Sequence, residues 1–373
     1  MASTVVNSDY TQNVIRDHTA SGLKIRNLFG MTGTVVAPEF TLAKQEREDK
    51  SVCISTIDLR RLYLSADHKH RGVGEQIFIM AMGEVEHVLE VRNVIGEGPI
   101  WNSQEGNLYW VDFIEHHQIL QFSPRTRRLE IFETGIPVMA LALRKAGGFI
   151  AATSKGICTW DTQRKEFAPF CDPLAGRPSI RLNDAAVDIK GRFWVGTVND
   201  ANQKGPDGEL FRIQGDGSSQ VMDKNITVGN GMGWSPDRKI MYFTDTFRYS
   251  VYAYDYDAEA GTIKNRRTFV QMSPDGGLPD GLTVDSEGFV WSAFWGGWKV
   301  VRYNPEGKVD REFRLPVPNP TSCTFGGTKL DELYITSASL GLSEEEKKQH
   351  AQSGDLFCLK AGITGMDEPR FAG

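Results

Sequence analysis

The chain has 373 residues and a formal net charge of −6. This acidic balance argues against a nucleic-acid or anionic-membrane partner, because phosphate binding requires a concentrated basic surface. Hydrophobic residues at 40% and charged residues at 24% are typical of a soluble globular protein, and 38 glycines indicate many turns between short strands. The composition favours a β-rich protein that acts on a small molecule.

The N-terminal sequence gives no indication of secretion. MASTVVNSDY lacks the charged start and apolar run of a secretory signal, and the apolar run at residues 77–82 is too short to span a bilayer. Five scattered cysteines without a CxxC spacing fit reduced thiols better than disulfides. We expect a cytoplasmic protein.

Residues 1–83 differ in pattern from the rest of the chain. They contain scattered polar and charged residues without a sustained apolar period, so a packed core is not expected there. We predict a poorly structured N-terminal extension, disordered or loosely attached. Met80 and Met82 directly precede the next region, so a translation start at either position is an open alternative.

A short apolar segment recurs six times after this extension. The six segments are NLYWVDF, GGFIAAT, GRFWVGT, KIMYFTD, GFVWSAF and ELYITSA. Their central residues are Trp110, Ile150, Trp194, Tyr242, Trp291 and Tyr334, which by subtraction lie 40, 44, 48, 49 and 43 residues apart. This is the period of a four-stranded propeller blade.

The repeats predict an all-β, six-bladed β-propeller over residues 84–373. Further β-like segments between the repeats, such as GICTWD and GDLFCLKAG, would supply the outer strands. A ring closes without open edges only if the last blade is completed from the other end of the chain, and VEHVLEV at residues 85–91 is placed to do this. The polar stretch SEEEKKQHAQ predicts an exposed helix in a loop or a solvated insertion.

Polar residues occupy the same place in several repeats. Positions 11 to 13 residues before the strand centres fall where each blade enters its innermost strand, which lines the central channel of a propeller. The residues at these positions are Glu97, Met139, Asn183, Asn230, Asp280, and Ser322 or Cys323. A glutamate, two asparagines and an aspartate are therefore expected to face one axis.

Two carboxylates in one channel would repel each other, and burial would penalise their ionisation further. A bound divalent cation resolves this conflict. Oxygen donors suit Ca²⁺, Mg²⁺ or Mn²⁺, while a sparse ligand set with open positions also permits Zn²⁺ or Fe²⁺. Such a cation makes hydrolysis accessible by polarising a carbonyl and activating water. The histidines avoid these segments and neither GxSxG nor HExxH is present, so a serine-triad or zinc-protease mechanism lacks its residues.

An ordered set of motifs runs through residues 84–373. The motifs are GEGPIW, RLNDAAVDIKGRFWVGT, NGMGWSPD, IKNRR, LPDGLTVDSEGFVW and TSCTFGG. With them, the chain resembles the regucalcin-like family of senescence-marker proteins, gluconolactonases and luciferin-regenerating enzymes. The resemblance implies a six-bladed propeller with one divalent metal ion in the channel, held by Glu97, Asn230 and Asp280.

The same resemblance implies roles for neighbouring residues. Arg181 matches the substrate-contacting arginine of the family, and Asn183 matches its substrate-binding or auxiliary-ligand asparagine. Asp280 would also act catalytically by orienting or deprotonating the attacking water. Asp184 is either a support for the site or a turn residue. The loop GTVNDAN departs from the family pattern, with Asn199 and Asp200 where regucalcin has acidic residues, so no sugar preference is carried over.

The leading functional prediction is a divalent-metal-dependent hydrolase that opens sugar lactones, with a small-molecule lactone as its partner. Three alternatives remain open. One is a phosphotriesterase-like hydrolase on a similar propeller, and another is a calcium-binding protein without catalysis. The weakest is an inverting glycosidase that uses Glu97 and Asp280 as its carboxylate pair.

Overall fold

The computed structural model describes residues 16–19, 22–26, 32–35, 64–65 and 85–373. The chain divides into two units, Met1–Ala81 and Met82–Gly373. In the first unit, four short strands form an antiparallel sheet in chain order: β1 (Arg16–Thr19), β2 (Gly22–Arg26), β3 (Thr32–Val35) and β4 (Leu64–Ser65). The remainder of the extension predicted for residues 1–83, including Met80 and Met82, lies outside the described residues.

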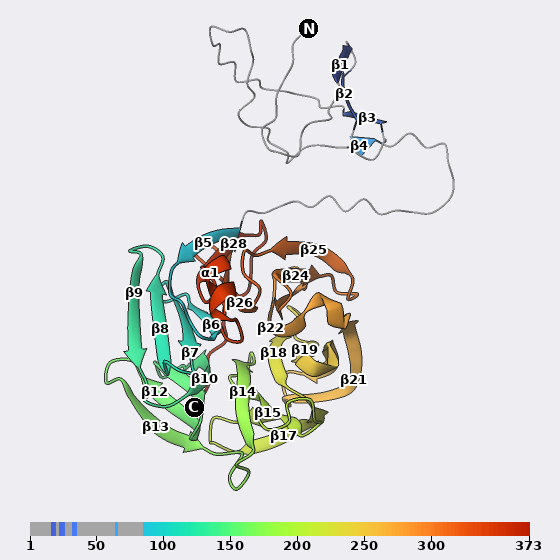
Figure 1. Ribbon diagram of the computed structural model, residues 1–373. Helices are drawn as coiled ribbons and strands as arrows, with labels where there is room; N and C mark the ends of the chain where they lie inside the picture. The colour runs from blue at the N-terminus through green and yellow to red at the C-terminus, as the bar shows by residue number, and fades with distance from the viewer. Residues whose placement is uncertain (1–15, 20–21, 27–31, 36–63, 66–84) are drawn as a thin grey trace. The chain divides into compact units, whose positions relative to one another are not determined.

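The second unit is a six-bladed β-propeller, as predicted, and each blade is a four-stranded antiparallel sheet (Figure 1). Blade 1 contains β6 (Gly96–Asn102), β7 (Asn107–Asp112), β8 (Gln118–Ser123) and β9 (Arg128–Glu133). Blade 2 contains β10 (Val138–Leu143), β11 (Phe149–Thr153), β12 (Gly156–Asp161) and β13 (Glu166–Cys171). Blade 3 contains β14 (Ile180–Val187), β15 (Phe193–Asn199), β16 (Gly208–Ile213) and β17 (Ser219–Ile226).

The remaining blades follow the same order from the centre outward. Blade 4 contains β18 (Gly229–Trp234), β19 (Ile240–Asp245), β20 (Ser250–Asp257) and β21 (Thr262–Gln271). Blade 5 contains β22 (Leu278–Val284), β23 (Val290–Trp295), β24 (Lys299–Tyr303) and β25 (Val309–Arg314). Blade 6 contains β26 (Pro320–Gly326), β27 (Glu332–Ser337), β28 (Leu356–Lys360) and β5 (Val85–Leu89).

Strand β5 closes the ring. It pairs antiparallel with β28, and Val85 lies opposite Leu359 while Leu89 lies opposite Leu356. The outermost strand of the last blade therefore comes from the start of the propeller sequence, as VEHVLEV predicted. This closure ties the two ends of the propeller together and protects the edge of the last sheet.

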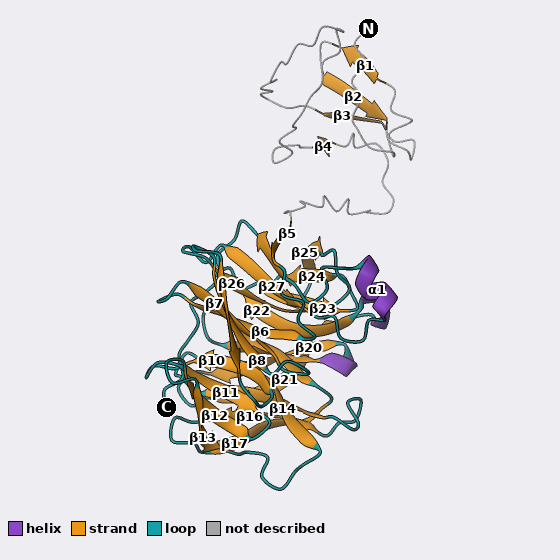
Figure 2. Cartoon of the chain, turned by 60° about the vertical axis from the view of Figure 1, so that its left-hand side comes forward, coloured by secondary structure: helices purple, strands orange, loops and turns teal. Residues whose placement is uncertain are grey.

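The recurring apolar segments are the second strands of the blades, and the segments predicted to lie outside them are the third strands. The innermost strands β6, β10, β14, β18, β22 and β26 pack against their neighbours around the centre of the ring (Figure 1). Helix α1 (Glu344–Gln349) is the predicted loop helix, and it lies on the face of the propeller opposite the C-terminus (Figure 2). In the described part of the chain, no helix is long and apolar enough to cross a membrane.

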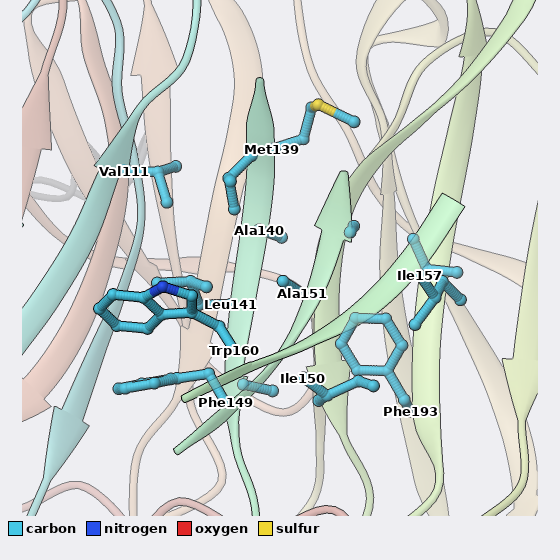
Figure 3. Close-up of a cluster of buried hydrophobic side chains, with 14 of the residues drawn as sticks. Val111, Met139, Ala140, Leu141, Phe149, Ile150, Ala151, Ile157, Trp160 and Phe193 are labelled. Carbon is cyan, nitrogen blue, oxygen red and sulfur yellow. The ribbon is translucent and has the colours of Figure 1, made fainter. Parts of the chain in front are cut away.

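The core lies within and between the blades. Around β10 and β11, small residues such as Ala140 and Ala151 pack beside the large rings of Phe149 and Trp160, and Phe193 joins them from the next blade (Figure 3). Each fully buried aromatic or aliphatic side chain contributes roughly 1.5–3 kcal/mol. Because this packing recurs from blade to blade, it holds the innermost strands around the channel.

Candidate functional site

In each blade, the pairing between the first and second strands shifts register once. The shift lies close to the residue found 11 to 13 positions before the centre of the second strand. The shifts lie between Glu97 and Ile100, Val138 and Ala140, Leu182 and Ala185, Gly229 and Met232, Pro279 and Leu282, and Pro320 and Ser322. Such a shift leaves residues unpaired and turns their side chains out of the regular alternation. The fold thereby provides six equivalent places where a side chain can be redirected.

The local sequence of β6 explains its register shift. Gly98 has a φ of +53°, a left-handed conformation that strains most residues with a side chain. Pro99 has no N–H to donate to β7. The Gly98 N–H donates a hydrogen bond to Oε2 of Glu97 at 3.1 Å. The same backbone turn that interrupts the pairing therefore also holds the Glu97 carboxylate.

Two of the predicted residues, Asn183 and Asn230, are in direct contact. Asn183 Nδ2 donates to Asn230 Oδ1 at 3.0 Å and to the Gly229 carbonyl at 3.0 Å. Asn230 Nδ2 donates to Thr246 Oγ1 at 3.0 Å. These contacts fix the Asn230 amide, and its oxygen keeps one lone pair for a further partner. Thr246, which lies directly after β19, was not identified from the sequence.

Glu97, Asp184 and Asp280 form a cluster of carboxylates in the channel. Glu97 is 9% exposed and Asp280 is 5% exposed. Burial raises the pKa of Glu97 to about 8, with a further contribution from the charge of Asp184. Burial also raises the pKa of Asp280 well above its usual range, and the charges of Glu97 and Asp184 raise it further. The pKa of Asp184 is raised by burial to about 6.

The residues fit a divalent cation on the chemistry of their donor atoms. Asp280 Oδ1 is buried and has no hydrogen-bond partner among the described residues, which is costly unless another group satisfies it. Carboxylate and amide oxygens, as in Glu97, Asp280 and Asn230, are suitable ligands for hard cations. In the described part of the chain, no three histidine, cysteine, aspartate or glutamate side chains converge on one metal position. Asp184 thus adds charge to the cluster without completing a set of three carboxylate ligands.

Arg181 lies on β14, two residues before Asn183. Its Nε donates to Asp200 Oδ1 at 2.7 Å, and its Nη1 donates to Asn183 Oδ1 at 2.5 Å. The guanidinium also lies 5.6 Å from the centre of the Phe113 ring. Asp200, whose role the sequence left undefined, therefore contacts the predicted substrate-binding arginine directly.

A large pocket opens on the channel. Its volume is about 1260 Å³, and its lining includes Phe113, Ile114, Arg181, Phe247, Asp280 and Trp295. The pocket combines aromatic and aliphatic walls with a few polar groups, which is the usual composition of a small-molecule site. Arg181 and Asp280 thus line one cavity.

The C-terminal segment, residues 361–373, crosses the turns that connect the first and second strands of several blades. The Gly365 N–H donates to Leu330 O at 2.7 Å, the Phe371 N–H to Leu143 O at 2.7 Å, and the Ala372 N–H to Gly191 O at 2.9 Å. Arg370 Nη2 donates to Asn102 Oδ1 at 2.7 Å. The segment thus connects blades 6, 1, 2 and 3. Its contacts join single residues far apart in the chain, so no motif indicated them.

The C-terminal segment also borders a second cavity, of about 100 Å³. Asp184, Trp234, Arg238 and Glu368 are among its lining residues. Burial raises the pKa of Glu368 to about 7, and the charge of Asp367 acts in the same direction. Because Asp184 belongs both to this cavity and to the carboxylate cluster, the cavity lies directly beside the candidate site.

Comparison with known proteins agrees with this architecture. Residues 95–339 match the family model described as SMP-30/Gluconolactonase/LRE-like region. Regucalcin from Xenopus laevis is 34% identical over 300 residues, which cover 79% of this chain and 100% of that protein. A 6-deoxy-6-sulfogluconolactonase from Pseudomonas putida is 36% identical over 288 residues, which cover 77% of this chain and 98% of that protein.

A solved structure shows the same likeness over the same part of the chain. The structure of a luciferin-regenerating enzyme superimposes with a TM-score of 0.73 at 28% sequence identity, and the match covers 78% of this chain and 99% of that chain. The family model, the two relatives and the shared fold lead to one conclusion. The chain belongs to the SMP-30/gluconolactonase/LRE-like family.

Proposed function

We propose that this protein is a divalent-metal-dependent hydrolase that opens sugar lactones, and that residues 84–373 carry the activity. The observation that carries the proposal is the buried Oδ1 of Asp280, which has no partner among the described residues, on a residue that also lines the large pocket. Membership of the family, and a relative named as a sulfogluconolactonase, support a sugar lactone as the substrate.

In this proposal, Glu97, Asn230 and Asp280 hold one divalent cation. When bound, the cation supplies Lewis-acid chemistry, because it polarises a carbonyl oxygen and lowers the pKa of bound water. The oxygen donors favour Ca²⁺, Mg²⁺ or Mn²⁺, and three protein ligands with open positions also permit Zn²⁺ or Fe²⁺.

Side chains at the site would then bind the lactone and transfer the proton of the attacking water. Asp280 orients the attacking water, accepts its proton at a carboxylate oxygen and returns that proton to the ring oxygen as the bond between the carbonyl carbon and the ring oxygen breaks. Arg181 Nη2 donates to a substrate hydroxyl or to the ring oxygen. The second lone pair of Asn183 Oδ1 accepts from a hydroxyl.

We also place the protein in the cytoplasm. Four cysteines in the described part of the chain, Cys158, Cys171, Cys323 and Cys358, are free thiols. Free thiols persist in reducing compartments, which supports the location expected from the sequence.

The test is a lactone panel run on the full chain after removal of bound metal. Wild type and Asp280→Ala are supplied in turn with Ca²⁺, Mg²⁺, Mn²⁺, Zn²⁺ and Fe²⁺. Acid release from γ- and δ-aldonolactones is then followed at constant pH, and bound metal is quantified in both proteins. We expect at least one cation to accelerate opening by the wild type, and Asp280→Ala to lose both activity and metal.

Three outcomes would contradict the proposal. Failure of every cation to accelerate opening of any lactone rejects the activity. Turnover of an organophosphate triester above that of every lactone would favour the phosphotriesterase-like alternative. Tight calcium binding without turnover of either substrate class would favour the non-catalytic calcium-binding alternative.

A further inference from the structure

The protein engages two of the three nitrogens of the Arg181 guanidinium. A guanidinium carries five N–H groups, one on Nε and two on each terminal nitrogen. Nε donates to Asp200, and Nη1 donates both to Asn183 Oδ1 and to the Leu182 carbonyl at 3.1 Å. Nη2 has no acceptor among the described residues. Only this nitrogen is left for a ligand in the pocket.

Asp200 is held in place by the loop that carries it. Its N–H donates to the Ser179 carbonyl at 3.3 Å, on the segment that leads into β14. The preceding residue, Asn199, donates from Nδ2 to Asp207 Oδ2 at 2.9 Å and accepts the Ala201 N–H at 3.1 Å. The loop after β15 therefore presents Asp200 to Arg181 through contacts of its own.

The engagement of Nε and Nη1 decides what Arg181 can bind. Arginine recognises an anion most strongly through two parallel N–H groups on neighbouring nitrogens. Asp200 engages Nε, and Asn183 and the Leu182 carbonyl engage Nη1, so Nη2 has no free neighbouring nitrogen with which to form such a pair. An anionic group would meet only Nη2, and it would also be repelled by the Asp200 carboxylate. A neutral hydroxyl needs a single N–H and experiences no such repulsion.

We propose that Asp200 is a specificity-determining residue that adapts the pocket to neutral polyhydroxy lactones and disfavours lactones with an anionic substituent. The inference rests on the proposed function. Asp200 acts by engaging Nε of Arg181 and by neutralising its charge, whereas the contact with the substrate itself is made by Nη2.

The other basic residues that line the pocket do not offset this effect. Arg177 Nη1 is already 2.5 Å from Glu209 Oε2. Lys155 is exposed and has no ion pair among the described residues. An exposed ammonium is strongly screened by water and salt, so it contributes little attraction for an anion. The Asp200 carboxylate is itself 56% exposed and is screened in the same way, so Asp200 acts mainly by engaging Arg181 and less by repelling the anion.

The test compares two lactones that differ only at one carbon, δ-gluconolactone and 6-deoxy-6-sulfogluconolactone. Their kcat/KM values are measured with the metal-loaded full chain as wild type, Asp200→Asn and Asp200→Ala. Removal of the carboxylate frees a charge-assisted pair of donors, so we expect the ratio of sulfonated to neutral kcat/KM to rise about tenfold in Asp200→Ala. Asp200→Asn removes the charge but keeps an acceptor, so the ratio should rise by about threefold.

Asp255→Asn is the matched control. Asp255 accepts from Arg267 Nη1 at 2.8 Å in a similarly exposed ion pair on the outer strands β20 and β21, away from the pocket. Its substitution should leave the ratio unchanged. An unchanged ratio in both Asp200 variants, or a wild type that prefers the sulfonated lactone, would overturn the inference.

A binding experiment tests the role of Asp200 independently of the proposed lactonase activity. The affinities for gluconate and for 6-deoxy-6-sulfogluconate are measured by calorimetry on the same proteins. If the wild type opens neither lactone, the proposed function fails, yet a rise in relative affinity for the sulfonated acid in Asp200→Ala still supports the role of Asp200. Equal affinity ratios in wild type and Asp200→Ala contradict that role, whatever the turnover.

Discussion

Two aspartates at opposite ends of strand β22 have opposite surroundings. Asp280 lies near its start and Asp285 directly follows its end, and they are 5% and 0% exposed. Asp285 Oδ2 accepts from Arg302 Nε and from Trp291 Nε1, both at 2.9 Å. Asp280 Oδ1 lacks a partner among the described residues, and the charges that raise its pKa include that of Glu97. Both aspartates are therefore buried, but only the charge of Asp285 is compensated by a positively charged partner.

The compensated arrangement recurs in another blade. Asp188 Oδ2 accepts from Trp194 Nε1 at 2.9 Å and from Arg192 Nε at 2.6 Å. In both blades the aspartate stands six residues before the tryptophan. An aspartate that recurs in two blades together with its hydrogen-bond donors stabilises the fold. The uncompensated carboxylate cluster in the channel is better explained by a function in binding a ligand.

The largest expected effect is on catalysis by Asp280. Asp280→Asn should lower lactone kcat/KM by at least about 1000-fold, because it removes the proposed base and one cation ligand. The free energy of unfolding without metal should not fall, since the substitution removes a buried carboxylate that lies near others. The measurements are initial rates and urea unfolding in the presence of a chelator. If Asp280→Asn lost stability but kept its activity, Asp280 would be a structural residue and not a catalytic one.

Asp285→Asn is the matched substitution at the other end of the strand. It should lower the free energy of unfolding by about 3 kcal/mol, because it leaves the buried Arg302 without one of its carboxylate partners. Arg302 is 2% exposed, so water cannot replace the lost partner. Urea unfolding gives the stability, and metal content per folded molecule should equal that of the wild type. A stability equal to the wild type would show that the compensated pair is dispensable.

A smaller effect is expected for Glu97. Glu97→Gln keeps the shape and one oxygen of the side chain but removes its charge, so affinity for the divalent cation should fall about 30-fold, equivalent to about 2 kcal/mol. Metal titration by calorimetry measures the affinity. Glu105→Gln, in the turn after β6, is the control and should leave the affinity unchanged. Unchanged affinity in Glu97→Gln would exclude Glu97 as a ligand.

The ring of blades was predictable because its cause repeats along the sequence. Each blade needs an apolar second strand that is buried on both faces, and this need places Trp194 and Trp291 at equivalent points. The closure by β5 followed from the same logic, since a lone strand beside the repeats must complete the last sheet. A fixed offset from these strands then sufficed to select the channel positions.

The contacts around the site were not predictable in the same way. In a regular strand, Asp184 would face away from the side that carries Asn183, but the register shift between Leu182 and Ala185 removes that alternation. The pairing of Asp200 with Arg181 depends on the path of a loop, which has no period. The repeat in the sequence therefore predicts where the site lies. Register shifts in the strands and the paths of loops determine which neighbouring residues contact it.

The smallest expected effect concerns Glu368, on the side of the carboxylate cluster that the C-terminal segment borders. The pKa of Glu368 is raised by burial from its ordinary 4.5 to about 7, so between these pH values the folded protein keeps a proton that the unfolded chain releases. The free energy of unfolding must then fall as pH rises through this window. A full shift would correspond to about 3 kcal/mol, but the side chain is only half-buried, so we expect about 1 kcal/mol.

Glu368→Gln should remove that part of the pH dependence while keeping an acceptor for Thr324 Oγ1, which donates to Glu368 Oε1 at 3.3 Å. Relative to the wild type, the variant gains about 1 kcal/mol at pH 8 and little or nothing at pH 4.5. Urea unfolding at several pH values in the presence of a chelator measures the difference, with the exposed Glu345→Gln in α1 as control. Parallel pH profiles for wild type and Glu368→Gln would mean that this carboxyl is as well solvated as any on the surface. Glu368 would then not belong with the uncompensated carboxylates, and that group would consist of Glu97, Asp184 and Asp280.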